Sequence, residues 1–436
     1  MALLALAPAL LAPAAQGQET ATSEAEAAGT TEAAEPAGYV AGDSGAGLVL
    51  GGYLDLGFAR AQGNGSSFHP RDARLPADYV VDAFAPAVNS RGDVASTDAG
   101  GRFTNGFLPR SVGIGGRPSF LINTVDLDLR YEPAPSAVPV MMFARVQLLP
   151  RFGAAGSETR LFVEQAFARL SPLPTQELAI SAGRFDPVFG IEYLENQANL
   201  RTGITPSLLA RYTTGTPAGI KALYRLQLPP LLSALSLNAA VTNGGTFVEA
   251  LQPAEVSLAG RPTLSARVGW ELDLPRVQLK LGGSGESGAR NDQGDRHAGQ
   301  RLLGGDARLR LFGLSVAGEY VRVDLDSGPA ADKRTGTGPQ TLPSEFHARA
   351  FYLFASYELA FTRGPLRRAT LYARGERRHA WFEGVAPVTV MRLTGGLRLD
   401  FWDVLAFKAE YLRNVELAGA PTVDNDVLAL SLVYTF

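Results

Sequence analysis

The sequence predicts an all-β protein: a transmembrane antiparallel up-and-down β-barrel of about 16 strands, with short periplasmic turns and long outer loops. Three observations support this fold class. Apolar residues recur with a period of two in many segments, and long and short connections alternate between those segments. Beyond the first residues, no apolar run approaches the roughly 18 residues that a membrane-spanning helix needs.

Residues 1–16 read as a signal peptide, because an apolar stretch is followed by small residues around Ala12, Ala14 and Ala15. The usual positive residues before the apolar stretch are missing. Either the start codon is misplaced or the segment is not an export signal, and we favour the first. Residues 17–46 are rich in Ala, Thr, Glu and Gly and have little apolar surface to bury, so we expect a disordered acidic linker.

Residues 47–436 form the predicted barrel. Residues 17–46 hold six of the 43 acidic residues and none of the 40 basic ones, so the barrel segment carries a net charge of about +3. The chain has no cysteine, which excludes thiolate metal sites and disulfides. The predicted barrel segment therefore carries a small positive net charge.

The strand period is clear in residues 426–436, where Leu428, Leu430, Leu432, Tyr434 and Phe436 share one face. The predicted strands are 48–60, 119–132, 138–149, 160–170, 176–185, 215–226, 235–243, 263–273, 276–285, 301–312, 314–325, 346–359, 369–379, 388–401, 404–415 and 426–436.

Connections after even-numbered strands are short and often contain proline, as in "EPAPSA" and "SPLPTQ". Those after odd-numbered strands are generally longer, and they are 61–118, 186–214, 244–262, 286–300 and 326–345. A soluble β-sandwich also has alternating strands, but this asymmetry of connections is typical of an outer-membrane barrel.

Aromatic residues on the outward face near strand ends predict girdles at the headgroup level of the membrane. They are Tyr131, Tyr224, Trp270, Tyr357, Phe401, Tyr411, Tyr434 and Phe436. A terminal aromatic such as Phe436 also resembles the sorting signal that barrel-assembly machinery recognises. We therefore expect outer-membrane lipid and this machinery as partners.

Candidates for catalysis are few. The four histidines, His69, His297, His347 and His379, lie in or beside predicted outer loops and have no metal-ligand spacing. "GLVLGG" and "GIGG" do not open a helix, so they do not predict a phosphate-binding loop. We expect no catalytic residue, no metal, no cofactor and no nucleic-acid partner, and the chain is predicted not to be an enzyme.

Charged residues on the predicted strands must face the lumen, because Arg or Lys at mid-depth in lipid costs roughly 2–4 kcal/mol. The candidates for pore lining are Arg267, Arg374, Arg378, Arg392, Arg398, Lys408 and Glu410. Charges of mixed sign over many strands indicate a water-filled interior, which a barrel of this size leaves open. An inert lattice of salt bridges in a closed barrel is the alternative.

The stretch "GRFDPVFGIEYLENQANLRTG" begins the third outer loop. Its Gly183, Phe185, Pro187, Phe189, Gly190 and Glu192 resemble the G-x-F-x-x-P/F-G-x-E pattern of phosphate-selective porin O/P-like proteins. The continuation through "TGTPAGIKALYRL" is similar to OmpL-like β-barrel porins. The resemblance implies a bacterial outer-membrane channel, often trimeric, with the third loop folded inward. It makes Arg184, Asp186, Glu192, Glu195 and Arg201 candidates for the constriction.

These observations together predict an outer-membrane porin. It would form a water-filled, weakly anion-preferring channel for passive diffusion of small hydrophilic solutes or ions. We expect a homotrimer, and small solutes or anions as its cargo. Two alternatives stay open at this point. One is an outer-membrane barrel hydrolase that uses a histidine at the outer rim, and the other is a structural or adhesive barrel without an open pore.

Overall fold

The computed structural model describes residues 47–61, 119–133, 138–149, 160–173, 177–195, 197–213, 216–228, 233–243, 262–289, 299–326, 328–330, 340–342, 345–382, 387–417 and 426–436. The predicted signal peptide (1–16), the predicted linker (17–46) and nearly all of the predicted first outer loop lie outside this part of the chain.

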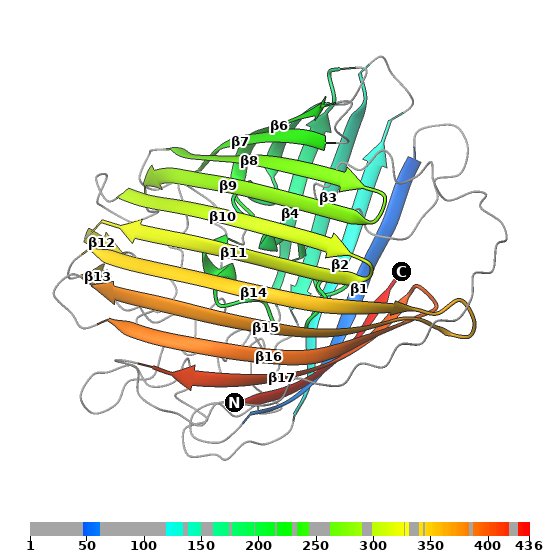
Figure 1. The fold of residues 1–436 in the computed structure, drawn as a ribbon. Helices are drawn as coiled ribbons and strands as arrows, with labels where there is room; N and C mark the ends of the chain where they lie inside the picture. Colours follow the sequence, from blue (N-terminus) through cyan, green and yellow to red (C-terminus); the bar gives the residue numbers. More distant parts are fainter. Residues whose placement is uncertain are drawn as a thin grey trace.

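Sixteen antiparallel strands close into one barrel, as predicted (Figure 1). They are β1 (Gly47–Ala61), β2 (Ser119–Glu132), β3 (Val140–Leu149), β4 (Arg160–Leu170), β5 (Leu178–Arg184), β6 (Ala218–Leu228), β7 (Ser233–Asn243), β8 (Pro262–Leu274), β9 (Val277–Ala289), β10 (Gly299–Leu311), β11 (Leu314–Leu325), β14 (Phe346–Ala360), β15 (Leu366–Phe382), β16 (Val388–Phe401), β17 (Leu405–Glu416) and β18 (Val427–Thr435). Each corresponds to one predicted strand, with ends that differ by a few residues.

The connection between β11 and β14 contains a feature that the sequence did not predict. Two short strands, β12 (Gly328–Ala330) and β13 (Gln340–Leu342), pair with each other as a separate sheet. They lie at the rim beside the ends of β11 and β14 (Figure 1). None of the helices in the described ranges has the length and apolar composition that crossing a membrane requires.

The period of two puts apolar side chains on the outside of the barrel. In β18, Leu428 and Leu432 are exposed, whereas the alternating Ala429 and Val433 are buried inside. Large apolar side chains elsewhere on the outer face are also mostly exposed, such as Leu161 at 68% and Leu353 at 58%. A continuous apolar belt of this kind is stable in lipid and not in water.

The eight aromatic residues of the predicted girdles all belong to the outward-facing set of their strands. Tyr131, Tyr357, Tyr434 and Phe436 are exposed near the turn end of the barrel, and Tyr411 is exposed nearer the loop end. Tyr434 and Phe436 stack with their ring centroids 6.2 Å apart. Their contact with lipid headgroups stays a prediction.

Closure of the barrel depends on the pairing of the first and last strands, β1 and β18. Two backbone hydrogen bonds extend this pairing beyond β18: Gly52 N donates to Phe436 O at 3.1 Å, and Phe436 N donates to Gly52 O at 3.0 Å. Phe436 therefore contributes to closure with its backbone as well as with its ring.

Deleting Phe436 is expected to reduce the fraction of folded, heat-modifiable barrel, because both backbone bonds and the aromatic ring are lost. Gel mobility with and without heating measures this fraction. Phe436→Leu is the matched control, since it keeps the two backbone bonds and removes only the ring. Equal amounts of folded barrel from wild type and the deletion would show that closure does not need this residue.

Candidate functional site

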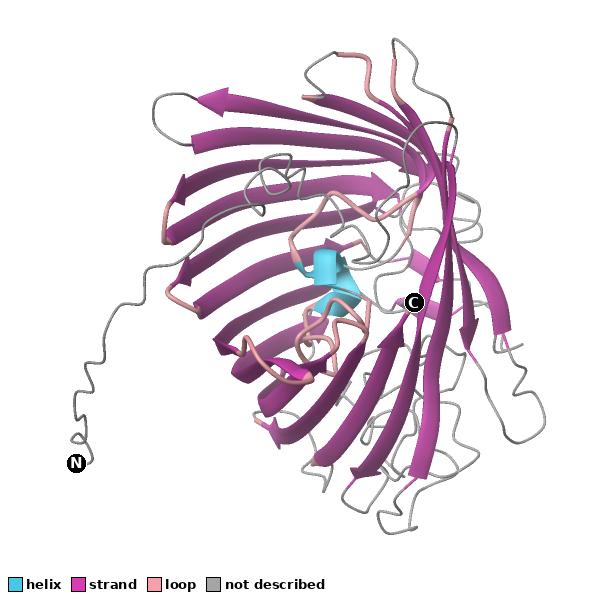
Figure 2. Ribbon diagram, turned by 90° about the vertical axis from the view of Figure 1, so that its right-hand side faces the viewer, coloured by secondary structure: helices cyan, strands magenta, loops and turns pink. Residues whose placement is uncertain are grey.

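The connection between β5 and β6, residues 185–217, lies inside the barrel and is called the inward loop here (Figure 2). It contains a 3₁₀ helix, η2 (Glu192–Glu195), and one short α-helical turn, α1 (Ala210–Thr213). A loop in the lumen has backbone N–H and C=O groups that need partners. The inner faces of β9 to β17 provide many of them.

The first part of the inward loop is held by Glu319 on β11. Its carboxylate accepts hydrogen bonds from Ile191 N at 3.3 Å and from Glu192 N at 3.2 Å. Ser284 Oγ on β9 accepts a bond from Gly190 N at 3.0 Å. Gly190 has a φ of 75°, and a Cβ there would lie 1.9 Å from Glu319 Oε1. Only glycine allows the carboxylate to approach the loop so closely.

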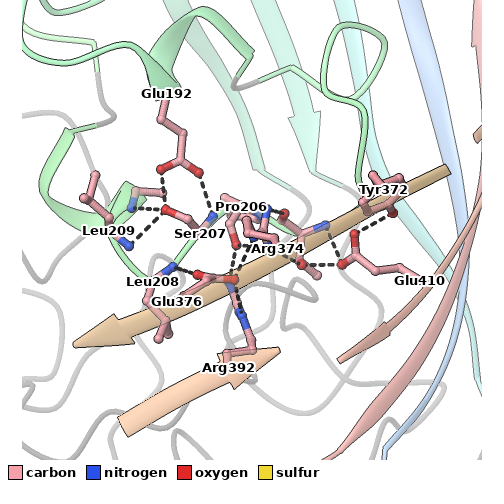
Figure 3. A network of polar contacts seen from close by, with 12 residues as sticks. Glu192, Pro206, Ser207, Leu208, Leu209, Tyr372, Arg374, Glu376, Arg392 and Glu410 are labelled. Atoms are coloured by element: carbon pink, nitrogen blue, oxygen red, sulfur yellow. Dashed lines mark hydrogen bonds and ion pairs between the residues drawn. The ribbon is translucent and has the colours of Figure 1, made fainter. Parts of the chain in front are cut away.

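The middle of the inward loop is held by Glu410 on β17 (Figure 3). Its carboxylate accepts bonds from Ile204 N at 2.9 Å, from Thr205 N at 3.1 Å and from the Thr205 hydroxyl. Tyr372 Oη on β15 donates a further bond at 2.8 Å. A Cβ on Gly203 would lie 2.6 Å from Glu410 Oε2, so a second glycine makes room for a second carboxylate.

Glu376 on β15 is the third anchoring carboxylate, and two arginines flank it (Figure 3). It accepts bonds from Arg374 Nε at 2.7 Å, from Arg392 Nε at 2.9 Å and from Leu208 N. Both arginines also donate to the carbonyl oxygen of Pro206. All three charged side chains are buried. A buried charge is tolerated only when it is paired and hydrogen-bonded, as it is here.

Cationic side chains hold the loop through its carbonyl oxygens. Lys408 Nζ donates to Ala198 O at 2.5 Å and to Gly203 O at 3.1 Å, and Arg398 Nη1 donates to Arg201 O at 3.0 Å. These bonds satisfy carbonyl groups that have no strand partner. The loop is therefore fixed to the wall along much of its length.

The helical turn α1 is positioned by contacts at both ends. Arg378 Nε on β15 donates to Tyr212 Oη at 2.7 Å. Ser207 Oγ accepts bonds from Leu209 N at 3.0 Å and from Ala210 N at 3.2 Å, as a helix-capping residue does. Ser207 in turn donates from its backbone N to Glu192 at 2.6 Å.

Glu192 is partly buried within the loop. Burial raises the pKa of its carboxyl group above the usual value, and nearby Arg374 and the bonds from Ser207 oppose this effect. Glu192 therefore joins η2 to the Ser207 turn within the loop, while Glu319, Glu376 and Glu410 join the loop to the barrel.

The other predicted constriction residues differ in position. Arg184 shares the outward face of β5 with Ile180 and Ala182, and its Nη1 donates to Val163 O at 3.0 Å. Asp186, at the start of the loop, accepts a bond from Gln165 Nε2 at 2.6 Å. Arg201 Nη2 donates to Ile204 O at 2.6 Å. Glu195 pairs with Arg308 on β10.

Charged residues on the inner face of β6 to β10 keep access to solvent. The exposed fractions of the side chains are 31% for Arg225, 29% for Lys280, 19% for Arg308 and 34% for Glu195 on the loop. Arg310 is also exposed. Arg267 instead pairs with Asp306 at 2.6 Å and is less accessible. Water therefore reaches one side of the lumen, whereas the loop covers the inner face of β15 to β17.

The structure brings eight of the predicted residues together around the inward loop: Glu192, Arg201, Arg374, Arg378, Arg392, Arg398, Lys408 and Glu410. Their role in lining a conducting path stays a prediction. Sequence reasoning did not select Glu319, Tyr372 or Tyr212. A carboxylate on the inward face of an otherwise small and apolar segment, "VAGEYVRV", is the signal that could have identified Glu319. No described group of His, Asp and Glu side chains could hold a metal ion.

No protein-family model matches the sequence, and no curated protein is significantly similar to it. Solved structures do match. The outer membrane channel DcaP of Acinetobacter baumannii is 13% identical with a TM-score of 0.52, over 91% of this chain and all of that one. The anion-selective porin of Comamonas acidovorans is 11% identical with a TM-score of 0.52, over 90% of this chain and all of the porin.

A third match is OmpF of Salmonella typhi, which is 14% identical with a TM-score of 0.50, over 89% of this chain and 97% of OmpF. The chain has a porin-like fold. The apolar belt on the outer face of this barrel indicates that it lies in a membrane.

Proposed function

We propose that the protein is a porin: a water-filled channel for passive diffusion of small hydrophilic solutes or ions. The observation that supports this most directly is the solvent access of inward-facing charges on β6 to β10, while the middle of the inward loop is fixed to β15 and β17. A barrel of about sixteen strands is wide enough to leave an aqueous channel. The inward loop would then form the narrowest part of the path.

We also propose a weak preference for anions. The accessible inward residues on β6 to β10 and on the loop include four basic side chains, Arg225, Lys280, Arg308 and Arg310, and three acidic ones, Glu195, Glu271 and Asp273. Several pairs partly neutralise each other: Arg225 and Glu271 lie 2.9 Å apart, and Lys280 and Glu271 lie 3.2 Å apart. The small excess of positive charge attracts anions without creating a strong binding site.

Cysteine substitution tests the path directly, because the chain has no cysteine of its own. A charged thiol reagent is expected to lower the single-channel conductance of Arg310→Cys in a planar bilayer, since this side chain faces the lumen and is exposed. Ala307→Cys on the same strand is the control, because it faces outward. No conductance in either variant, or an equal response in both, would reject the channel that we propose.

The alternative functions make different predictions. The two described histidines make separate contacts: His347 Nδ1 lies 2.7 Å from Asp324, and His379 Nδ1 lies 2.7 Å from the Thr389 hydroxyl. A hydrolase of the kind considered needs one histidine that contacts both a nucleophile and an orienting acid. Neither described histidine makes both contacts, and this favours a barrel that is not an enzyme. A structural or adhesive barrel would show no conductance. Assembly into a homotrimer and recognition by barrel-assembly machinery stay predictions.

A further inference from the structure

Four arginines gather on the outside of the barrel, on four neighbouring strands: Arg301 on β10, Arg322 on β11, Arg349 on β14 and Arg377 on β15. We call them the outer arginine cluster. All four are exposed. They lie near the strand ends that carry the longer connections, at the rim where β12 and β13 are labelled in Figure 1.

Strand register places these charges close to each other. Arg322 is directly opposite Arg349, and Arg349 is directly opposite His379. Arg301 is opposite Asp324, and Asp324 is opposite His347. Like charges directly opposite on neighbouring strands destabilise a sheet. The cluster therefore favours a bound anion that would offset this repulsion.

Acidic residues in the described part of the chain balance the cluster only in part. Asp324 Oδ2 lies 2.9 Å from Arg322 Nε, and its other oxygen lies 2.7 Å from His347. Glu345 lies 3.8 Å from His347. Arg349 instead lies over the Trp381 ring at 5.5 Å. Within the described ranges, no carboxylate forms an ion pair with Arg301, Arg349 or Arg377.

The depth of the cluster is indicated by the residues next to it. Tyr320, Phe351 and Leu353 are outward-facing and exposed, and they continue β11 and β14 toward the turn end of the barrel. Arginine is unfavourable against hydrocarbon but is tolerated at the membrane interface. The cluster thus lies at the outer edge of the apolar belt, at the level of lipid headgroups.

We infer that the outer arginine cluster binds the phosphate group of an anionic lipid in the outer leaflet. Guanidinium groups match phosphate oxygens with paired hydrogen bonds, and several strands would contribute to one site. The acyl chains of the same lipid would lie along Phe351 and Leu353. This inference concerns the outer surface, so it does not depend on conduction through the lumen.

Native mass spectrometry of the full chain, released from neutral detergent, tests the inference with lipid A that carries two phosphates and with dephosphorylated lipid A. Wild type is expected to bind the phosphorylated lipid at least about tenfold more tightly. Arg349→Gln with Arg377→Gln should remove most of this difference. The control is Arg363→Gln with Arg367→Gln, which removes the same charge from exposed arginines at the turn end of the barrel.

A second pair, Arg301→Gln with Arg322→Gln, tests the same cluster from two other strands, and heat-modifiable mobility shows that each variant is folded. Added salt should weaken the binding of wild type, because the interaction is between exposed charges. Equal binding of the two lipids by wild type, or unchanged binding by the folded cluster variants, would overturn the inference. Conductance of the cluster variants should equal that of wild type.

Discussion

Glu376→Gln combined with Glu410→Gln is expected to raise the single-channel conductance and the current fluctuations strongly. These carboxylates accept bonds from the loop amides of Leu208, Ile204 and Thr205. A hydrogen bond to a charged group contributes about 1.5–3 kcal/mol, so weakening several of them favours the released loop by more than tenfold. The glutamine side chain also has an NH₂ group in place of one carboxylate oxygen, and this group cannot accept the hydrogen bonds that the oxygen accepted.

Planar-bilayer recordings measure this effect, and protease sensitivity of residues 197–213 gives an independent measure of loop release. Glu358→Gln is the control, because Glu358 is exposed and, among the residues that the structure describes, pairs only with Arg368, at 3.4 Å. Heat-modifiable mobility shows whether the double variant is folded. A folded double variant with the conductance and noise of wild type would mean that these carboxylates do not control the loop.

Lys280→Glu combined with Arg310→Glu is expected to change the channel from weakly anion-preferring to cation-preferring. Both side chains belong to the accessible inner face of β9 and β10, and the substitutions replace two positive charges with two negative ones. The difference should be large at low salt and small at high salt, because the Debye length falls from about 30 Å at 0.01 M to about 3 Å at 1 M. The reversal potential across a KCl gradient measures it.

Arg363→Glu with Arg367→Glu provides the matched control for charge, since both residues are in or next to the turn between β14 and β15. That variant should keep the selectivity of wild type. If the inward variant also keeps it, the conducting path does not pass Lys280 and Arg310. If wild type prefers cations strongly, the proposed anion preference is wrong whatever the variants do.

The strands could be predicted because their signal is local. In β18, the alternation from Val427 to Tyr434 decides which face meets lipid, and no distant residue is needed to read it. The same holds for the short turns: only two residues, Phe312 and Gly313, separate β10 from β11, with φ values of 48° and 82°. The β12–β13 pair was missed, since strands of three residues have too few positions to show a period.

The course of the inward loop could not be predicted from composition or periodicity. Its bonds join residues far apart in the sequence, as between Ile191 and Glu319 or between Ile204 and Glu410. The motif with Gly190 and Glu192 indicated a functional loop by resemblance, but it did not identify the carboxylate that Gly190 accommodates. A basic residue such as Lys408 looks the same in sequence whether it meets water or a loop carbonyl.

The anchors of the inward loop recognise its main chain and mostly not its side chains. Glu319, Glu410 and Lys408 bind amide and carbonyl groups that every residue except proline provides in full. Side chains of the loop that make no contact with the barrel wall can therefore change without changing the path of the backbone. Residues of the barrel wall thus fix the backbone conformation of the loop, whereas these side chains of the loop can vary.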